Sequence, residues 1–337
     1  MVIDAHTHYG IAYKGGKMFD MEVYTKFAKK YNVTQAIMMI TPMPLSVVSL
    51  KSFIEQYLTM FTEPKQKEIL KQAEDNIPHI SYIHYIRDNK SNKIKHYHGV
   101  KINNEFILDK LNFDPYFLPN KYFFEVAKAS HLIKPILSIH PLFFTKEQYF
   151  DYLKDSIGYK IHGIATCTSP ELISNEIIDF LKEENKPLVV HTEYDETPPK
   201  YKRKLFKENS TMKWVNFAIE NDLKLYLTHG ARLSHDAIAT VNKSHNIYIG
   251  IGPDYILSRT TGRMERIING KIDYLEYLCK NTRLDRICFD TDFPWNVDSS
   301  GDNFDFKTIE VLSNIIRHGP SLEMVLGENA SNLFNLM

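Results

Sequence analysis

The sequence predicts an α/β fold, a (β/α)8 TIM barrel with a helical and hairpin insertion between its second and third strands. Three observations support this prediction. Short apolar, β-branched runs alternate with segments of helical period, eight such runs occur, and His or Asp stands at the ends of several of them. Such alternation gives parallel strands joined by helical crossovers, and eight is the strand number of this barrel.

The predicted strands are short and mostly apolar, and they span residues 1–6, 35–41, 134–140, 157–162, 187–192, 223–229, 246–251 and 286–292. Helices are expected between them. Residues 20–31 carry an apolar stripe behind the capping residue Asp20. Ser169-Pro170-Glu171 places a hydroxyl, a proline and an acid where a helix would begin.

An insertion is expected between the second and third strands, because residues 42–133 far exceed the length of a βαβ crossover. Within it, residues 51–76 have helical character, and runs 80–87 and 94–102 flank a turn at 88–92. We interpret residues 46–130 as a lid or a dimer arm. No Pro/Gly/Ser-rich linker marks a second domain, so residues 1–337 are expected to form one domain.

Composition restricts the partners. The 337 residues include 43% hydrophobic and 24% charged residues, with 41 Lys and Arg against 41 Asp and Glu. Because these opposite charges balance, the chain has no net charge that would attract nucleic acid or acidic membranes. A small-molecule substrate is expected instead. Three cysteines, a start without a basic segment and the absence of a long apolar run predict a cytoplasmic protein without membrane spans.

The pair His6 and His8 is the first candidate for chemistry. Residues two apart on a strand face the same side, so both imidazoles can point into a barrel mouth and share a metal ion. Because the chain has 14 histidines, an HxH pair alone is a weak signal.

Further His and Asp residues at strand ends strengthen the pair. His191, His229 and Asp292 follow apolar runs in the strings PLVVHTEYD, LYLTHGAR and RICFDTDFPW. In a TIM barrel these strand ends converge on one mouth, so all five residues can belong to one site.

The strings IDAHTH, GYKIHG, VVHTE, LTHGAR, FDTDFPW and GENASNLFNL span both ends of the chain in this order. With them the chain resembles the amidohydrolase superfamily, in particular its amidohydrolase-2 branch, which includes aminocarboxymuconate semialdehyde decarboxylase. Members of that branch are hydrolases, decarboxylases and occasional hydratases. The resemblance therefore implies the architecture more closely than the reaction.

The resemblance implies that His6, His8 and His191 are nitrogen ligands and that Asp292 touches the metal and shuttles a proton. One divalent ion is expected, zinc first, with manganese, iron or nickel as alternatives. In binuclear members of the superfamily a carboxylated lysine bridges two metals, so Lys160 is either such a bridge or an unmodified contact to substrate or an acid. A homodimer is also implied.

Other polar residues near these strand ends have two interpretations each. His229 either stabilises a developing oxyanion or is a packed core histidine, and Arg232 either clamps a substrate carboxylate or begins a surface helix. His162 and Glu193 are candidates to contact substrate, with a structural ion pair as the alternative for Glu193. Asp290 is expected to support the ligands from behind or to cap a helix.

These residues predict a metal-dependent hydrolase that attacks a small-molecule amide, lactone or ester with a metal-bound hydroxide, with Asp292 and His229 as the catalytic residues. The chief alternative is nonoxidative decarboxylation of a small unsaturated or aromatic acid, which a carboxylate clamp at Arg232 would favour. A non-catalytic metal-binding barrel is the third hypothesis; it predicts a closed coordination shell.

Overall fold

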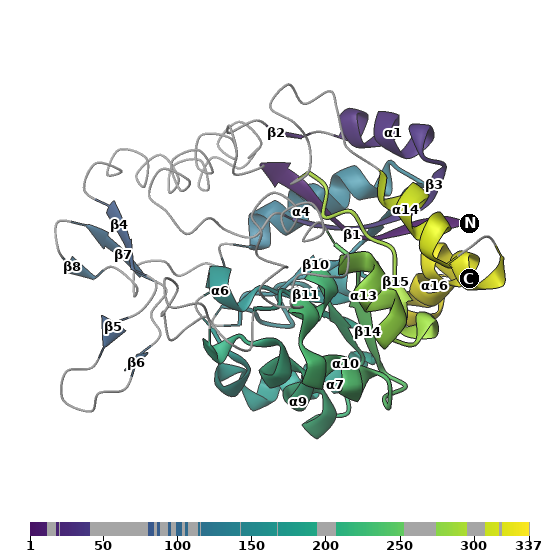
Figure 1. Ribbon diagram of the computed structural model, residues 1–337. Coiled ribbons are helices and arrows are strands. Elements are labelled where there is room, and N and C mark those ends of the chain that lie inside the picture. Colours follow the sequence, from purple (N-terminus) through teal and green to yellow (C-terminus); the bar gives the residue numbers. More distant parts are fainter. Residues whose placement is uncertain are drawn as a thin grey trace.

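The protein is described from a computed structural model, which places residues 1–11, 18–19, 21–40, 80–83, 86–87, 94–95, 99–102, 105–106, 114, 116–141, 143–166, 168–193, 207–252, 274–294, 307–316 and 319–336. Parallel strands form its centre, with helices around them (Figure 1). The parallel strands are β1 (Val2–Ile11), β3 (Val33–Ile40), β9 (Ile133–Pro135), β10 (Leu137–Ser138), β11 (Tyr159–Ile161), β12 (Leu188–Val190), β13 (Leu225–Leu227), β14 (Ile247–Gly250) and β15 (Ile287–Cys288).

Neighbouring parallel strands in these sheets follow the order of the sequence. One sheet has the order β2-β1-β3-β9, in which the short β2 (Met18–Phe19) pairs antiparallel with the end of β1, and the other has the order β10-β11-β12-β13-β14-β15. Only Ile136 separates β9 from β10. The predicted parallel strands with helical crossovers are therefore confirmed, whereas the described residues form two sheets and not one continuous closed sheet.

Backbone hydrogen bonds connect β1 with the segment that follows β15. The amide of Ala5 donates to the carbonyl of Phe289 at 3.0 Å, and the amide of His8 donates to the carbonyl of Phe293 at 2.7 Å. Thr7 and Phe293 also form a parallel bridge. The first and last parallel strands of the chain thus lie side by side.

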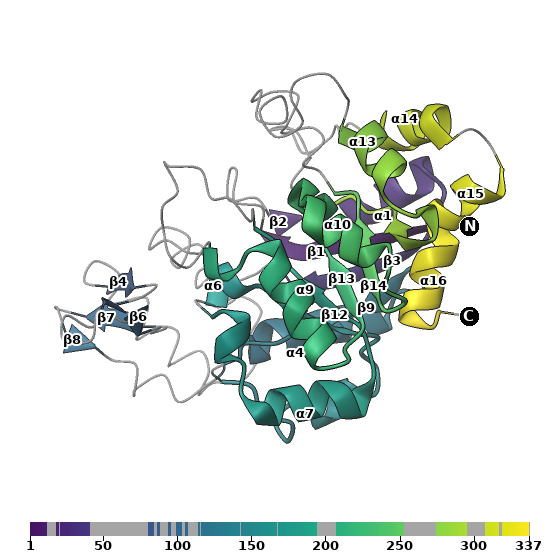
Figure 2. The same ribbon diagram turned by 60° about the horizontal axis from the view of Figure 1, so that its bottom comes forward.

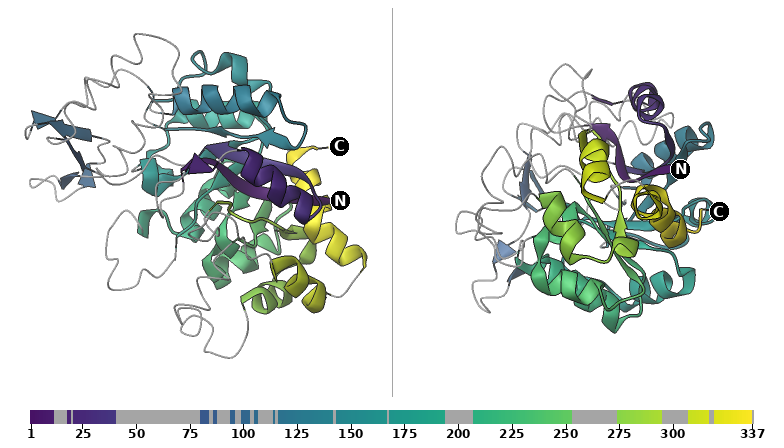
Figure 3. Two further views of the ribbon diagram at one scale, coloured as in Figure 1. Left: turned by 90° about the horizontal axis from the view of Figure 1, so that it is seen from above. Right: turned by 45° about the vertical axis from the view of Figure 1, so that its right-hand side comes forward.

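Helices surround the parallel strands, as the views in Figures 2 and 3 show. The α-helices are α1 (Met21–Lys30), α4 (Phe117–Lys128), α5 (Phe150–Leu153), α6 (Gly163–Thr166), α7 (Asn175–Glu184), α9 (Thr211–Glu220), α10 (His235–Val241), α13 (Tyr274–Asn281), α14 (Lys307–Ile316), α15 (Pro320–Glu323) and α16 (Asn329–Phe334). Shorter or irregular helices are η3 (Pro170–Leu172), η5 (His229–Leu233), η6 (Leu284–Arg286) and η7 (Met324–Glu328). Among the described residues, none of these helices is long and apolar enough to cross a membrane.

The two faces of the strands belong to different hydrophobic clusters. Alternate residues such as Tyr159 and Ile161 of β11 pack outward against the helices. Inward-facing residues such as Ile3, Val189 and Cys288 pack with Leu333 and Phe334 of α16. Because strand side chains alternate, polar residues that continue the inward series beyond the strands gather at the carboxyl ends.

Several predicted boundaries differ from the structure. The helix expected from Ser169 is only the short η3, and α7 begins later, with the Ser174 hydroxyl accepting the amide of Ile177. The predicted helix start was therefore too early in the chain. Both serines have an extended backbone, but only the side chain of Ser174 accepts a capping hydrogen bond. The expected helix at 51–76, the turn at 88–92 and the cap at Asp20 lie outside the described residues.

Short antiparallel strands occupy part of the long segment between β3 and β9. These strands are β4 (Ile80–Ile83), β5 (Ile86–Arg87), β6 (Ile94–Lys95), β7 (Gly99–Ile102) and β8 (Glu105–Phe106). β4 pairs with β7 and β5 with β6, so runs 80–87 and 94–102 pair antiparallel. They lie on the side toward which β1 points (Figure 1). Helix α4, by contrast, buries Phe123 and Phe124 in the outer hydrophobic cluster.

Candidate metal centre and active site

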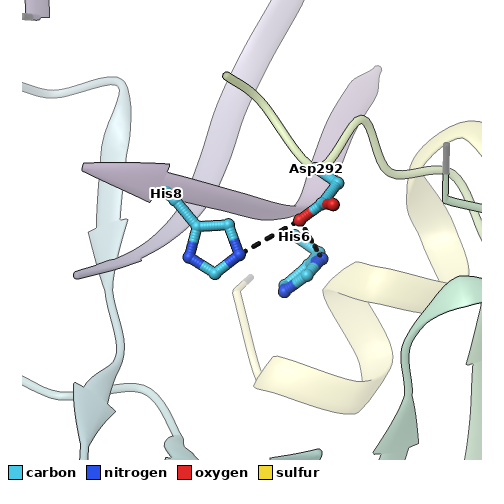
Figure 4. A group of neighbouring side chains, drawn as sticks. All are labelled: His6, His8 and Asp292. Carbon is cyan, nitrogen blue, oxygen red and sulfur yellow. Dashed lines mark ion pairs between the residues drawn. The ribbon is translucent and has the colours of Figure 1, made fainter. Parts of the chain in front are cut away.

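His6 and His8, within β1, form one compact group with Asp292. The carboxylate oxygen Oδ1 of Asp292 lies 3.3 Å from Nδ1 of His6 and 3.0 Å from Nε2 of His8 (Figure 4). One ligand atom from each residue lies within 4.8 Å of the other two, and all three side chains are buried. The structure thus brings together three of the four predicted metal ligands, from opposite ends of the chain.

Local backbone geometry sets this group. His6 and His8 alternate with Thr7 on β1, and the amide of Asp292 donates to the carbonyl of His6 at 2.8 Å. Asp292 itself has φ 49°, in the left-handed region that few residues other than glycine adopt. This turn brings the carboxylate back over the strand that carries both histidines.

The electrostatics of the group suit a divalent cation. Burial, together with the nearby Lys160 and His8, holds the pKa of His6 well below its ordinary value, so the imidazole is neutral at neutral pH. Nδ1 of His6 and Oδ1 of Asp292 are buried and make no hydrogen bond with the described residues. Imidazole nitrogens and a carboxylate are ligands that zinc and related ions prefer, so the residues fit a metal ion.

The second ring nitrogen of His8 faces a backbone carbonyl. Nδ1 of His8 lies 3.3 Å from the carbonyl oxygen of Ile40, the last residue of β3. A proton on Nδ1 would donate to this carbonyl and leave the lone pair of Nε2 directed at the group. Such a contact is the usual way in which a metal-binding histidine is oriented.

Lys160 lies behind His6. Its Nζ is 3.2 Å from Nε2 of His6, the ring nitrogen opposite the one that faces Asp292. Burial lowers the pKa of Lys160 to about 7, against the opposing effect of Asp292 and Asp290. In this structure Lys160 therefore contacts a predicted ligand, and its role as a metal bridge or substrate contact stays a prediction.

His191 faces a neighbouring polar cluster and not the three-residue group. Its Nδ1 lies 3.0 Å from Nε2 of His229, and its Nε2 lies 3.3 Å from both Glu193 Oε1 and a terminal nitrogen of Arg232. Both ring nitrogens thus have protein partners. The role of His191 as the third nitrogen ligand stays a prediction.

Arg232 is fixed at the edge of this cluster. Its Nε donates to the carbonyl of Thr192 at 2.8 Å. After burial, the Arg232 charge is the largest influence that holds the pKa of both His191 and His229 well below the ordinary value. The guanidinium therefore faces the site, which agrees with a functional position more than with a surface helix.

The turn that carries His229 and Arg232 is left-handed throughout. All five residues of η5, from His229 to Leu233, have positive φ between 50° and 58°. Consecutive left-handed residues are costly for L-amino acids, on the order of 1 kcal/mol each. Strain of this kind persists where the surroundings fix it, and it often marks functional sites.

His162 and Glu193 also lie in this cluster. The His162 ring stacks on His191 with 3.9 Å between centroids, and burial keeps the pKa of His162 well below its ordinary value. Oε1 of Glu193 lies 3.3 Å from Nε2 of His191. Because the low pKa of His191 leaves its imidazole uncharged, this contact is not an ion pair, and the role of Glu193 stays a prediction. The predicted residues therefore fall into two adjacent sets, His6–His8–Asp292 with Lys160, and His191–His229 with Arg232, His162 and Glu193.

Asp290 is buried and bonds residues other than His6, His8 and Asp292. Its Oδ2 accepts the Tyr226 hydroxyl at 2.6 Å, and its Oδ1 accepts the amide of Gly252. Burial raises the pKa of Asp290 to about 7. Asp290 is not part of the three-residue group, and its described partners belong to β13 and the end of β14.

Solved structures with a similar overall fold include amidohydrolases. A protein described as amidohydrolase II superposes with a TM-score of 0.55 and 11% identity over 99% of this chain and 100% of its own. An amidohydrolase from Burkholderia multivorans has a TM-score of 0.52 and 8% identity over 99% of both chains. This chain shares the overall fold of these two proteins. A protein from Agrobacterium tumefaciens matches similarly, with a TM-score of 0.54 and 11% identity over 100% of this chain and 96% of its own.

This fold likeness stands without sequence likeness. No family model matches the sequence, and no curated protein is significantly similar to it. The amidohydrolase fold explains why single polar residues far apart in the chain meet, since the strands run parallel and present their carboxyl ends on one side.

Sequence reasoning missed Asp4 and Thr291, two residues that hydrogen-bond each other beside Asp292. Asp4 is buried in the apolar run before His6 and bonds Thr291, the neighbour of Asp292. The available signal was an acid inside an otherwise apolar strand, because a buried carboxylate requires specific partners.

Proposed function

We propose that this chain is a metal-dependent hydrolase that cleaves an amide, lactone or ester in a small molecule. The observation that carries the proposal is the convergence of two buried histidines and one carboxylate, His6, His8 and Asp292. The amidohydrolase fold of the solved structures supports it. Zinc is the expected ion, with manganese, iron or nickel as alternatives.

A divalent ion held by these residues would polarise a substrate carbonyl and lower the pKa of a coordinated water. The protein's own residues supply the proton transfers. Asp292 lies within the group and accepts the proton of the attacking water, then returns it to the leaving nitrogen or oxygen. The carbon–nitrogen or carbon–oxygen bond breaks, and water supplies the oxygen of the new carboxylate.

His229 is proposed to stabilise the oxygen of the tetrahedral intermediate. Nε2 of His191 lies 3.3 Å from both a terminal nitrogen of Arg232, which can only donate, and Oε1 of Glu193, which can only accept when ionised. We propose that this nitrogen accepts from Arg232, so that the proton of His191 is on Nδ1. The Nδ1–H of His191 then donates to Nε2 of His229. The single proton of the neutral His229 ring is therefore on its own Nδ1. This nitrogen is buried and makes no hydrogen bond with the described residues, so it can donate to substrate.

We further propose that the parallel strands form a (β/α)8 barrel in a single domain, residues 1–337, and that residues 46–130 are a lid or dimer arm. The hydrogen bonds between β1 and the segment after β15 support a barrel arrangement. A small-molecule substrate and a homodimer remain the proposed partners.

The experiment is a hydrolysis assay after chelator treatment and reloading with Zn²⁺, Mn²⁺, Fe²⁺ or Ni²⁺. The panel should hold small esters, lactones and amides, each with and without a carboxylate. We expect hydrolysis of at least one class that requires the metal and is lost in Asp292→Asn. Absence of hydrolysis with every ion would contradict the proposal.

Nonoxidative decarboxylation is the second candidate, and one observation favours it. The Arg232 guanidinium is held beside His191 and His229 by its bond to the Thr192 carbonyl, where it can bind a substrate carboxylate. Release of carbon dioxide from small unsaturated or aromatic acids, without hydrolysis in the panel above, would select this reaction. A chain that binds metal but performs neither reaction would be a non-catalytic metal-binding protein.

A further inference from the structure

Asp4 is a fully buried acid with a complete set of partners. Its Oδ2 accepts the Tyr24 hydroxyl at 2.8 Å and the Thr291 hydroxyl at 2.7 Å, and its Oδ1 accepts the Thr291 amide at 3.0 Å. A buried carboxylate is costly unless such bonds compensate for lost water. Two of its three bonds go to one residue, so Asp4 recognises Thr291 in particular.

Thr291 links Asp4 by hydrogen bonds to the turn that carries Asp292. Its hydroxyl donates to Asp4 and accepts the amide of Phe293 at 3.0 Å, so it contacts the backbone on the far side of Asp292. The Asp292 amide and the Phe293 carbonyl are bonded to His6 and His8 of β1. Asp4, on the same strand, thus holds the turn from a third point.

The turn needs such support because of its backbone. Asp292 has φ 49°, a conformation that is unfavourable for residues with a Cβ atom. Strained conformations persist where surrounding contacts determine them. Without the hydroxyl of Thr291, the Phe293 amide and the Asp4 carboxyl would both lose a partner, and Asp292 would be free to relax away from the histidines.

We propose that Asp4 and Thr291 are positioning residues that set the direction of the Asp292 carboxylate toward His6 and His8, and so determine the affinity of the metal centre. Both residues are buried, and Asp4 faces Tyr24 of α1, so we assign them no contact with substrate. This inference rests on the proposed metal-dependent function and adds two residues that act through Asp292.

The two partners of Asp4 separate positioning from a general contribution to stability. The Tyr24 hydroxyl bonds the same carboxylate, and the Tyr24 ring packs against Phe293 of the Asp292 turn, with 5.0 Å between centroids. Tyr24→Phe keeps that ring and removes only its hydroxyl bond. It is therefore the matched control for Thr291→Val, which removes the hydroxyl that links Asp4 with the turn while keeping the side-chain shape.

The experiment measures the dissociation constant of Zn²⁺ by competition with a chromophoric chelator, in full-length wild type, Thr291→Val, Thr291→Ser and Tyr24→Phe. Thermal unfolding of the metal-free proteins is recorded in parallel. We expect Thr291→Val to bind Zn²⁺ about 10- to 100-fold more weakly, as is usual when support for a ligand is lost. Thr291→Ser keeps the hydroxyl and should restore binding to near the wild-type value.

Tyr24→Phe should lower the unfolding midpoint by about 2–4 °C, comparable with Thr291→Val, but leave Zn²⁺ affinity near wild type. Affinity loss in Tyr24→Phe equal to that in Thr291→Val would overturn the inference, because a structural role alone would then explain both. Wild-type affinity in Thr291→Val would overturn it as well. If Thr291→Val does not fold, Asp4→Asn, which replaces one acceptor by a donor, takes its place with the same expected loss.

Failure of the proposed function gives a different result. If wild type binds no Zn²⁺, the metal centre itself is wrong. If wild type binds and Thr291→Val binds equally, the centre stands and the positioning role is wrong.

Discussion

Nζ of Lys160 lies 3.2 Å from Nε2 of His6, on the side of the ring away from Asp292. This contact gives the lysine a role that the sequence did not suggest. If a metal ion binds Nδ1 of His6, the proton of the neutral ring is on Nε2. This N–H can then donate a hydrogen bond to the lone pair of an uncharged Lys160 amine. Burial brings the pKa of Lys160 to about 7, where the uncharged amine is well populated at neutral pH.

We predict that Lys160→Met retains one metal ion per chain, because Lys160 contacts the ring of a ligand and does not bridge two ions. The metal content of wild type and variant, measured by elemental analysis after dialysis, checks this. Two ions in wild type with one lost in the variant would instead establish a carboxylated bridging lysine.

Arg232→Lys should weaken binding of substrates that carry a carboxylate. Lysine has no Nε–H to donate to the Thr192 carbonyl and no planar fork for a carboxylate. We expect KM to rise about tenfold, roughly 1.4 kcal/mol, for a carboxylate substrate while a neutral analogue of the same ester is little affected. An equal change for both substrates would show that Arg232 acts on the site through His191 and not on substrate.

Asp114 should make stability depend on pH. It is buried, accepts the Tyr149 hydroxyl at 2.7 Å, and burial raises its pKa to about 6. The folded chain holds this proton more tightly than the unfolded chain, so the contribution is complete below pH ~4 and is lost as pH rises through ~6. The difference between these limits is on the order of 3 kcal/mol.

Urea unfolding of wild type and Asp114→Asn between pH 4 and 8 checks this sign. Wild type should lose stability relative to the variant as pH rises through that window. Tyr149→Phe removes a donor that lowers the pKa of Asp114, so the sloping region should extend to higher pH. A parallel pH dependence in wild type and Asp114→Asn would contradict the assignment.

Gly250 should tolerate no side chain. A Cβ atom at this position would overlap Oδ2 of Asp290 and the hydroxyl of Tyr226, which bond each other beneath the site. Gly250→Ala is expected to cost about 1–3 kcal/mol of unfolding free energy, the usual range for overpacking. Unchanged stability would mean that the Asp290–Tyr226 pair does not lie against β14.

The order and direction of the parallel strands follow from the sequence, but their ends do not. The prediction ran the last strand through Asp292, whereas β15 ends at Cys288 and Asp292 adopts a left-handed turn. Apolar and β-branched residues report where a strand is buried. They carry no information on where hydrogen bonding stops and the backbone turns toward a site.

The candidate site was predicted with similar limits. HxH spacing and strand-end Asp identified His6, His8 and Asp292, because residues two apart on a strand face the same side. The irregularity between Asp4 and Thr7 of β1, after which the even-numbered histidines join the group, has no signal in the sequence. The pairing of His191 with His229 and Arg232 depends on a left-handed turn that no residue type in HGARL requires. Asp4 and Thr291 escaped prediction because their contact joins residues almost a full chain length apart.

The central claim is that His6, His8 and Asp292 hold a divalent ion, and the most direct measurement is the metal-to-protein ratio of Asp292→Asn beside Asp290→Asn. Both changes replace a buried acid in the segment that follows β15, but only Asp292 belongs to the three-residue group. The account predicts about one ion per chain in wild type and Asp290→Asn, and a large loss in Asp292→Asn. Equal metal content in both variants, or none in reloaded wild type, would contradict it.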